Sequence, residues 1–415
     1  MTAIPIRMPS AHPGPALQAL PPLSLYIHIP WCVRKCPYCD FNSHEIGAPD
    51  LPSTNGRPAL EEGLEKRYVD ALIADLEQSL LLIWGRRVVS IFLGGGTPSL
   101  LSDRALDTLL SAVRARITVA PEAEITLEAN PGTFEAEKFR AFRAAGVNRL
   151  SVGIQSFNPR HLKSLGRIHD DVQARAAIEI AQREFDNFNL DLMYALPGQS
   201  LDEAVAEITT AVSFRPAHLS AYHLTVEPNT VFAKFPPVVP DDDTSADMQE
   251  AIEAVLQDHG YRHYETSAFA LPGFQARHNL NYWSFGDYLG IGAGAHGKIS
   301  FPDRIIRQVR YRAPRDYLAH AFEDSPVAQE GNVGVDELPF EFMMNALRLI
   351  DGFELRLFEE RTGVPLQQVR SELDQAEQDG LIWRDHVRMG PTVKGQRFLN
   401  DLLQRFLSAA NTPSQ

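Results

Sequence analysis

The chain has 415 residues, of which 44% are hydrophobic and 22% charged. This ordinary globular composition excludes a disordered, collagenous or coiled-coil class for the chain as a whole. Its 39 basic and 53 acidic residues give a formal net charge of −14, which disfavours nonspecific binding to nucleic acids and anionic membranes because both are negatively charged. At about 150 residues per domain, the length predicts one large domain with one or two smaller ones.

The cysteines indicate the compartment. Cys32, Cys36 and Cys39 are the only three in the chain, and such a crowded, odd-numbered set is typical of reduced thiols in a reducing compartment rather than of a disulfide framework. The first 22 residues contain six prolines and no continuous apolar run like that of a signal peptide. The apolar cluster at 80–84 is too short to span a bilayer. We therefore expect a cytoplasmic protein without a transmembrane segment, with peripheral membrane contact left open.

Six strand-then-helix units follow the Pro-rich N-terminal arm. Expected strands cover 23–29, 88–93, 124–129, 149–155, 189–193 and 218–224. Expected helices cover 60–83, a segment capped by Ser102 and ending near 117, 135–145, 170–185 and 201–212, with a loop at 46–58. Because adjacent parallel strands need a crossover, this alternation predicts a parallel sheet. Six units are fewer than the eight of a closed barrel, so we expect an α/β fold built as a partial (β/α)6 barrel.

The pattern changes after the sixth unit. We expect a disordered arm at 1–22, the partial barrel at 23–235, an α+β extension at 236–335 and a smaller, mostly helical domain at 336–415. Asp241–Asp243 and the prolines before them suggest a linker, followed by a helix at 245–259. Expected helices at 337–349, 354–362, 365–379 and 392–407, with strands at 381–384 and 387–389, resemble a winged helix. Nine basic against 13 acidic residues from 336 onward disfavour DNA binding.

The cysteine loop carries the strongest chemical signal. The spacing C-x3-C-x2-C, directly after the first expected strand, suits a soft metal or an iron–sulfur cluster. Three thiolates would hold three irons of a cubane cluster and leave the fourth iron open. Because a structural zinc site needs four ligands, the alternatives are a zinc ion completed by His28 or His44, or unligated thiols.

Polar or small residues stand at the ends of most other strands, where the functional groups of such folds gather. Consecutive glycines at Gly94–Gly96, followed by Thr97, allow a close backbone approach, and their N–H groups suit an anion; a flexible turn is the alternative. The remaining polar candidates are Glu128, Gln155, Arg167 in the loop after the fourth strand, and Asp191 inside an apolar strand. Each of these four alone is nearly as compatible with a structural role, but their joint placement favours a ligand site.

The cysteine spacing resembles that of the radical S-adenosylmethionine superfamily. In this superfamily S-adenosylmethionine chelates the open iron of a [4Fe-4S] cluster, and its reductive cleavage gives a 5′-deoxyadenosyl radical. Within it, the segments 26–32, 94–99, 128–131, 153–157, 165–169 and 191–198 look like oxygen-independent coproporphyrinogen III oxidases and their relatives. The resemblance implies that Cys32, Cys36 and Cys39 hold the cluster. It also implies S-adenosylmethionine contacts from Tyr26, Tyr38, Gly95, Gly96, Thr97 and Glu128, and a second such molecule near Gln155, Arg167 and Asp191.

Two departures favour a branch of that group. Phe41 stands where the oxidase has a fourth cysteine, and His278-Asn-Leu-Asn-Tyr282-Trp283 is similar to the H-N-x-x-Y-W signature of HemW-type haem chaperones. This resemblance implies that the protein binds haem and passes it to acceptor proteins of respiration. The alternative is the oxidase itself, which decarboxylates coproporphyrinogen. Whether the protein is an enzyme at all stays open at this stage.

The hexapeptide suits a haem contact, because neutral histidine is a common axial ligand and aromatic rings pack on a porphyrin face. We therefore expect haem near His278, Tyr282 and Trp283, with His296 as a competing ligand; without the resemblance, a polar turn with two core aromatics is the simpler interpretation. His223 is expected at the cofactor mouth. Gly292–Gly297 matches G-x-G-x-x-G, but no helix follows it, so we expect a tight turn near the hexapeptide rather than a dinucleotide site.

Overall fold

The computed structural model describes residues 14–46, 53–54, 57–58, 60–133 and 136–407. Within these residues one sheet of twelve strands dominates, in the order β11-β12-β10-β9-β8-β7-β6-β1-β13-β14-β15-β16. Six parallel strands form its centre: β1 (Leu23–Ile29), β6 (Arg87–Gly95), β7 (Thr118–Ala129), β8 (Arg149–Gln155), β9 (Phe188–Tyr194) and β10 (His218–His223). The predicted partial (β/α)6 barrel is therefore confirmed. Each expected strand overlaps one of the six, although β7 begins six residues before the expected start at 124.

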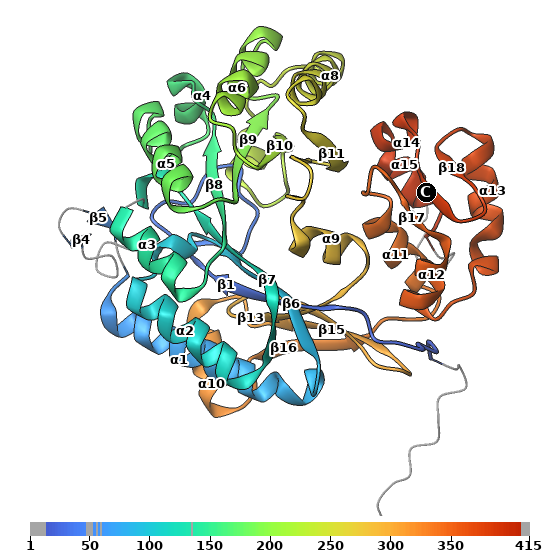
Figure 1. Cartoon of the computed structure of the whole chain (residues 1–415), viewed down its shortest axis with the longest axis horizontal. Helices are drawn as coiled ribbons and strands as arrows, with labels where there is room; N and C mark the ends of the chain where they lie inside the picture. The colour runs from blue at the N-terminus through green and yellow to red at the C-terminus, as the bar shows by residue number, and fades with distance from the viewer. Residues whose placement is uncertain (1–13, 47–52, 55–56, 59, 134–135, 408–415) are drawn as a thin grey trace, which may run out of the picture.

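Helices connect the parallel strands and cover the outside of the curved sheet (Figure 1). The bounds are α1 (Glu62–Ser79), which continues as a 3-10 turn η1 (Leu80–Ile83), α2 (Asp103–Arg116), α3 (Ala136–Ala145), α5 (Asp171–Glu184) and α6 (Leu201–Ser213). The Ser102 hydroxyl accepts a hydrogen bond from the backbone N–H of Ala105, as the expected N-cap does. A further short helix, α4 (Pro159–Ser164), has no counterpart among the expected elements.

Short strands and helical turns lie in the loops at the open end of the barrel. They are β2 (Trp31–Cys32), β3 (His44–Glu45), η2 (Pro98–Leu100), η3 (Pro131–Thr133) and α7 (Val231–Lys234). The loop expected at 46–58 lies largely outside the described residues, which show only the paired strands β4 (Ser53–Thr54) and β5 (Arg57–Pro58) within it.

The sheet extends beyond six strands at both edges. β13 (Asp287–Ile291) lies parallel to β1, with Leu23 opposite Asp287 and Ile27 opposite Ile291. The antiparallel strands β14 (His296–Ser300), β15 (Ile305–Arg310) and β16 (Val327–Asn332) continue this edge, and α10 (Pro314–Glu323) packs against α1. β12 (Ala268–Ala270) and β11 (Arg262–Glu265) extend the other edge. The mixed segment 261–330 therefore widens the same sheet.

The linker expected at Asp241–Asp243 is instead the start of a helix. Asp241 caps α8 (Asp242–Asp258) by accepting a hydrogen bond from the Thr244 N–H at 2.8 Å, and the two following aspartates form its first turn. Carboxylates are favoured there because they interact with the positive end of the helix dipole.

A second apolar core holds the mostly helical C-terminal region, drawn in red in Figure 1. It contains α11 (Leu338–Ala346), α12 (Leu355–Thr362), η4 (Leu366–Val369), α13 (Arg370–Gln378), α14 (Val393–Arg397) and α15 (Leu399–Gln404). Its small antiparallel sheet has the order β17 (Phe353–Glu354), β19 (Arg388–Pro391), β18 (Ile382–Arg384). The last expected helix, 392–407, is therefore two short helices.

The N-terminal arm is partly ordered, contrary to the expectation of disorder over 1–22. Residues 1–13 lie outside the described residues, but Leu17 is 7% exposed and packs into the C-terminal core. Its backbone N–H donates to the Pro302 carbonyl at 3.0 Å, and Arg86 donates to the Pro21 carbonyl at 2.6 Å. The chain therefore contacts its own C-terminal region before β1 begins.

Candidate functional site

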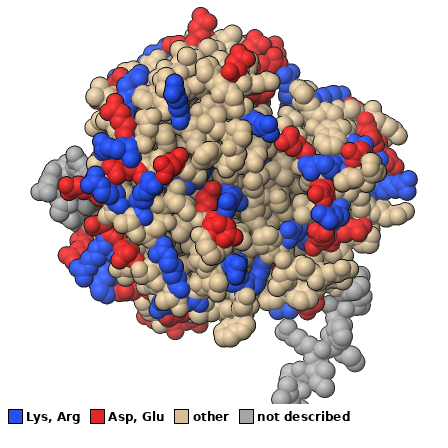
Figure 2. All heavy atoms as spheres, in the orientation of Figure 1, with Lys and Arg blue, Asp and Glu red and all other residues tan. Residues whose placement is uncertain are grey.

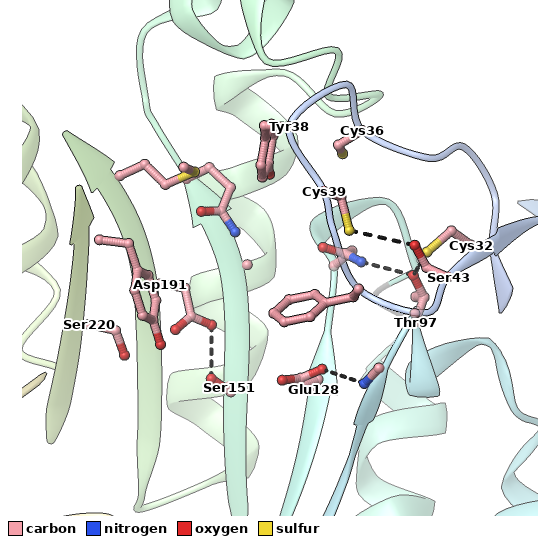
Figure 3. A pocket seen from close by; sticks show the side chains of 18 of the residues that line it. Cys32, Cys36, Tyr38, Cys39, Ser43, Thr97, Glu128, Ser151, Asp191 and Ser220 are labelled. Carbon is pink, nitrogen blue, oxygen red and sulfur yellow. Dashed lines mark hydrogen bonds between the residues drawn. The ribbon is translucent and has the colours of Figure 1, made fainter. Parts of the chain in front are cut away.

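A cavity of about 390 Å³ lies at the carboxyl ends of the parallel strands and reaches down into the barrel. Of the predicted site residues, Cys32, Cys36, Tyr38, Cys39, Gly95, Gly96, Thr97, Glu128, Gln155, Arg167 and Asp191 line it. Figure 3 shows side chains from the cysteine loop and from the neighbouring strands directed into this common space. The strand-end pattern in the sequence therefore marks one site.

Each thiol of the cysteine loop faces the cavity. The Thr97 hydroxyl donates to Cys32 Sγ at 3.7 Å, Cys39 Sγ lies 3.5 Å from the Ser43 hydroxyl, and Arg167 donates to Cys36 Sγ at 3.7 Å. Burial raises the pKa of the Cys32 thiol to about 11. Metal binding at this position must therefore displace a proton.

The histidines considered as zinc ligands are engaged elsewhere. His28 is 4% exposed; its Nε2 donates to the Asn42 carbonyl at 2.9 Å, and its Nδ1 accepts from the Tyr26 hydroxyl at 2.9 Å. His44 contacts Asn42 Oδ1 at 3.2 Å and the backbone of Arg312. In the described part of the chain, no three His, Cys, Asp or Glu side chains are grouped to hold a single metal ion. All three thiols, by contrast, line the cavity, and three thiolates suit an iron–sulfur cluster.

The glycine segment works differently from the expectation. Its N–H groups are used by acceptors within the protein rather than by a ligand anion: Gly95 donates to the Glu128 side chain at Oε2 at 3.1 Å, Gly96 to the Ile29 carbonyl at 2.7 Å and Thr97 to the Trp31 carbonyl at 2.8 Å. Nor is it a flexible turn. A Cβ on Gly95, whose φ is +112°, would lie 2.4 Å from the His28 ring. The glycines are therefore needed because β6 and the cysteine loop approach each other closely.

Two carboxylates face each other across the cavity. Burial, and then the charge of Asp191, raise the pKa of Glu128 to about 8. Burial also raises the pKa of Asp191, although Ser151 and Asn189 donate to its two oxygens at 2.9 and 2.8 Å. Asp191 is thus both hydrogen-bonded within the protein and exposed to the cavity, so a structural role and a ligand contact coexist at this residue.

The fourth strand ends in a constrained turn. Gln155 has a φ of +68°, in the left-handed region that side chains rarely adopt, and a bulge separates it from Gly153. Arg167 folds back to donate to the Gly153 carbonyl at 2.7 Å and also donates to Asn130. Such strain is common at ligand sites because it points a chosen side chain into a cavity.

Four predicted cofactor contacts do not line the cavity: Tyr26, expected for S-adenosylmethionine, and His278, Tyr282 and Trp283, expected for haem. The Tyr26 hydroxyl donates to His28 Nδ1, and the Tyr26 ring stacks on Phe92 with centroids 6.2 Å apart. Tyr26 therefore supports the cysteine loop through His28. Tyr38 does line the cavity and packs beside Phe232.

The hexapeptide forms a short helix, α9 (Arg277–Trp283), rather than a turn. His278 Nδ1 lies 3.2 Å from the Ser90 hydroxyl, and its ring packs on Phe92. Burial, followed by the Arg149 charge, lowers the pKa of His278 to about 4, so the imidazole is neutral at physiological pH. Asn279 lines the floor of the cavity.

The two aromatic residues of α9 have partners in the protein. The Tyr282 ring lies 4.9 Å from that of Tyr288, and the Arg348 guanidinium lies 5.0 Å from the Trp283 ring. These contacts join α9 to the sheet and to the C-terminal region, so the helix has a structural role whatever it binds.

The glycine-rich turn 292–297 is not near the hexapeptide. A turn is present, closed by a hydrogen bond from the Ala295 N–H to the Gly292 carbonyl at 3.0 Å. However, it follows the carboxyl end of β13, where Gly292 packs on His28, whereas α9 lies at the opposite end of this strand, near Asp287. His296, the competing haem ligand, is exposed beside this turn, while His223 lines the cavity as expected.

Several cavity residues escaped prediction. They are Phe92, Asn130, Arg149, Ser151, Asn189, Met193, His218, Ser220 and Tyr222. For six of them the signal is present in the sequence: polar residues stand at alternate positions of β8, β9 and β10, which places Arg149, Ser151, Asn189, His218, Ser220 and Tyr222 on the inner face. Barrel interiors usually hold branched apolar side chains, so a polar lumen is itself a mark of a ligand site.

The outer surface differs from the cavity. On the face shown in Figure 2, basic and acidic side chains are interspersed, the pattern of an ordinary solvated surface. None of the described helices is long and apolar enough to cross a bilayer.

Comparison with known proteins gives consistent results. The radical SAM superfamily model matches residues 26–210, and the HemN C-terminal domain model matches residues 335–398. The haem chaperone HemW of Escherichia coli is 48% identical over 94% of this chain and 99% of its own length, and that of Haemophilus influenzae is 46% identical over the same shares. Among solved structures, the coproporphyrinogen III oxidase of Escherichia coli superposes with a TM-score of 0.76 at 22% identity, covering 93% of this chain and 90% of the oxidase.

Proposed function

Because the chain belongs to the HemW family, within the radical SAM superfamily, we propose that it is a haem chaperone that binds haem and transfers it to acceptor proteins, respiratory ones among them. The superfamily's cofactors are a [4Fe-4S] cluster and S-adenosylmethionine. The need for reduced thiols favours the cytoplasm as the compartment.

One observation in the structure carries this proposal. A single cavity is lined by the three cysteines at its mouth and by Asn279 of the signature helix α9 at its floor. A cofactor at the mouth and a haem on α9 would therefore contact the same enclosed space. The partial barrel 23–235 would hold the cofactors, and the extension 236–335 would supply the haem contact.

The residues have distinct roles in this proposal. Cys32, Cys36 and Cys39 hold the cluster, which supplies one-electron chemistry together with S-adenosylmethionine. Further S-adenosylmethionine contacts come from Tyr38, Gly95, Gly96, Thr97, Glu128, Gln155, Arg167 and Asp191, and Tyr26 acts through His28.

His278 is suited to bind iron. Its Nδ1 is held by Ser90, its ring is neutral, and no partner for its Nε2 is found among the described residues. An imidazole oriented through one nitrogen and open at the other is the usual form of an axial ligand. Tyr282 and Trp283 would flank the macrocycle.

The second candidate function is coproporphyrinogen III oxidation. The shared placement of Gln155, Arg167 and Asp191 on the cavity favours it, since these are the positions linked by resemblance to a second cofactor molecule. Phe41, at the place of the oxidase's fourth cysteine, is 65% exposed and opposes it.

The test is an anaerobic incubation of the reconstituted protein with S-adenosylmethionine, a reductant and coproporphyrinogen III. We expect no vinyl product, from protein shown to carry a full cluster and to bind haem. Haem-loaded protein should then pass its haem to an apo-acceptor, followed by absorption spectroscopy. Stoichiometric vinyl product coupled to 5′-deoxyadenosine release would establish the oxidase and overturn the chaperone assignment.

A further inference from the structure

Arg149 is a buried cation for which the described part of the chain provides no hydrogen-bond acceptor. It is the first residue of β8, its side chain is 3% exposed, and it lines the cavity. Its Nε has no hydrogen-bond partner among the described residues, and neither does the hydroxyl of Thr126, its neighbour in register on β7. Leaving a buried guanidinium without acceptors is costly, so an acceptor from outside the chain is expected here.

The nearest carboxylate does not meet this need. Glu124 Oε2 lies 4.0 Å from Arg149 Nε, which is an ion pair beyond hydrogen-bond distance. The Glu124 oxygens instead accept the backbone N–H groups of Arg277 and His278, each at 3.2 Å, at the start of α9. Glu124 therefore offsets part of the charge of Arg149, while its two oxygens accept hydrogen bonds from the backbone at the start of α9.

Other polar side chains on the inner face of the barrel form hydrogen bonds with one another. His218 Nδ1 donates to Asn189 Oδ1 at 2.7 Å, Asn189 donates to Asp191, and the Tyr264 hydroxyl lies 2.8 Å from His218 Nε2. Since burial lowers the pKa of His218 well below its usual value, this ring is neutral and the order of donors is fixed. Arg167 also has an unpartnered Nε, but its other nitrogens donate to Gly153, Asn130 and Cys36. Among the described residues no acceptor is found for Arg149.

The position of Arg149 separates it from the cluster. It precedes Gln155 by six residues along β8 and is in register with Thr126 of β7 and Phe92 of β6. These two residues precede Glu128 by two positions and Gly95 by three, so a group held beside Arg149 lies roughly 7–10 Å below that layer at 3.3 Å per residue, on the floor side of the strand ends. Phe92 and Asn279 line the same floor. An apolar wall beside a planar cation suits a carboxylate on a short aliphatic arm, because a guanidinium pairs with carboxylates through two parallel hydrogen bonds.

We propose that the cavity floor beside Arg149 is a carboxylate-binding site and that, in the proposed function on which this inference rests, a propionate side chain of the haem occupies it. S-Adenosylmethionine also carries a carboxylate, but the cysteines that would hold its amino-acid end lie at the mouth. We therefore assign the site beside Arg149 to a propionate side chain of the haem.

The experiment compares haem with its dimethyl ester, in which both propionates are masked, by fluorescence quenching of the cluster-loaded protein. The wild type should bind haem at least about tenfold more tightly than the ester, the expected effect of one charged hydrogen-bonded pair. Arg149→Gln should remove this difference by weakening haem alone, and S-adenosylmethionine affinity should stay the same. Arg149→Lys keeps the charge but lacks the planar guanidinium, so it should retain part of the difference in affinity between haem and the ester.

Controls separate binding from folding. Iron content and the thermal midpoint verify each variant, Thr126→Val tests an uncharged change in the same layer, and Arg183→Gln tests an exposed arginine. If haem and ester still differ in both Arg149 variants, the site is structural and the inference is overturned. If S-adenosylmethionine affinity falls instead, the carboxylate belongs to the cofactor and the propionate assignment is overturned. If the wild type binds no haem, the proposed function fails first.

Discussion

The Arg310 guanidinium on β15 lies 3.0 Å from the Asp75 carboxylate on α1, and both side chains are fully buried. Tyr317 of α10 donates to the same carboxylate at 2.9 Å, and the backbone N–H of Gly292 donates to it at 3.1 Å. This one buried charge pair therefore joins the added antiparallel strands and α10 to the first helix of the barrel.

Removing one partner of this pair should destabilise the fold strongly. Arg310→Met leaves the Asp75 charge buried without compensation, and we expect a loss of about 3–5 kcal/mol in the free energy of unfolding, measured by urea denaturation. The double variant Arg310→Met/Asp75→Leu removes both charges and should lose less. A double variant less stable than the single one would show that the charge itself is not the cause.

Loss of one cysteine should abolish the cluster. We expect Cys36→Ala to lose the brown colour and the iron of the anaerobically reconstituted protein, because the chain has only three cysteines and each holds one iron in the proposed cluster. Phe41→Cys is the matched control; it adds a thiol in the same loop and should leave the iron content unchanged. Full iron content in Cys36→Ala would refute the ligand set.

Glu128 should be required for S-adenosylmethionine. Glu128→Gln keeps the shape but loses the carboxylate, so affinity should fall about tenfold in equilibrium dialysis, with iron content unchanged. Glu203 is the control position, because its exposed carboxylate accepts a hydrogen bond from the Ser200 N–H at the start of α6. Equal affinity in wild type and Glu128→Gln would exclude Glu128 from the cofactor site.

His278 should matter for haem and not for the cluster. His278→Ala should weaken haem binding by about tenfold or more and shift the Soret band, because the imidazole is the expected iron ligand. The exposed His296 provides the comparison. Should His296→Ala change the spectrum while His278→Ala does not, the axial ligand lies at the other end of β13.

Two buried histidines should each make the fold more sensitive to mild acid. Burial lowers the pKa of His28 and of His169 to about 4, below the value near 6.5 of an unfolded chain. The folded protein therefore binds fewer protons than the unfolded one between pH 6.5 and 4, and unfolding becomes easier as the pH falls through this window. For His28 the effect is on the order of 3 kcal/mol.

Urea midpoints at pH 7.5, 6 and 4.5 measure this effect. His28→Gln should show a shallower decline than the wild type, whereas a change at the exposed His386 should not. Parallel declines for wild type and His28→Gln would assign the acid sensitivity to other groups.

Local signals in the sequence were sufficient for the barrel. Ser102 predicted a cap and acts as one, and the polar residues at strand ends were visible because residue type and strand period are local properties. The role of the glycines could not be predicted in this way. The N–H groups of Gly95 and Gly96 donate to Glu128 and Ile29, which become their neighbours only in the folded sheet.

The errors share one cause. The partner of β13 is β1, which is distant in sequence, so the sequence alone did not show that β13 and the consecutive strands β14 to β16 paired onto it extend the main sheet. The turn at Gly292 was placed near α9 because the two are near in sequence. Likewise, Asp241–Asp243 was interpreted as a solvated linker, although the same acids suit a helix start. A single sequence shows residue composition and hydrophobic periodicity directly, but it does not show which strands pair or which of their ends lie together.

The position of β1 has a consequence for synthesis. Leu23 pairs with Val88 on one side but with Asp287 on the other, so one edge of the strand has no partner until about 260 more residues have left the ribosome. Closing so long a loop is slow, and an open apolar edge pairs readily with other chains. A nascent chain stalled before residue 287 should therefore aggregate or recruit holdase chaperones, and recover once β13 emerges.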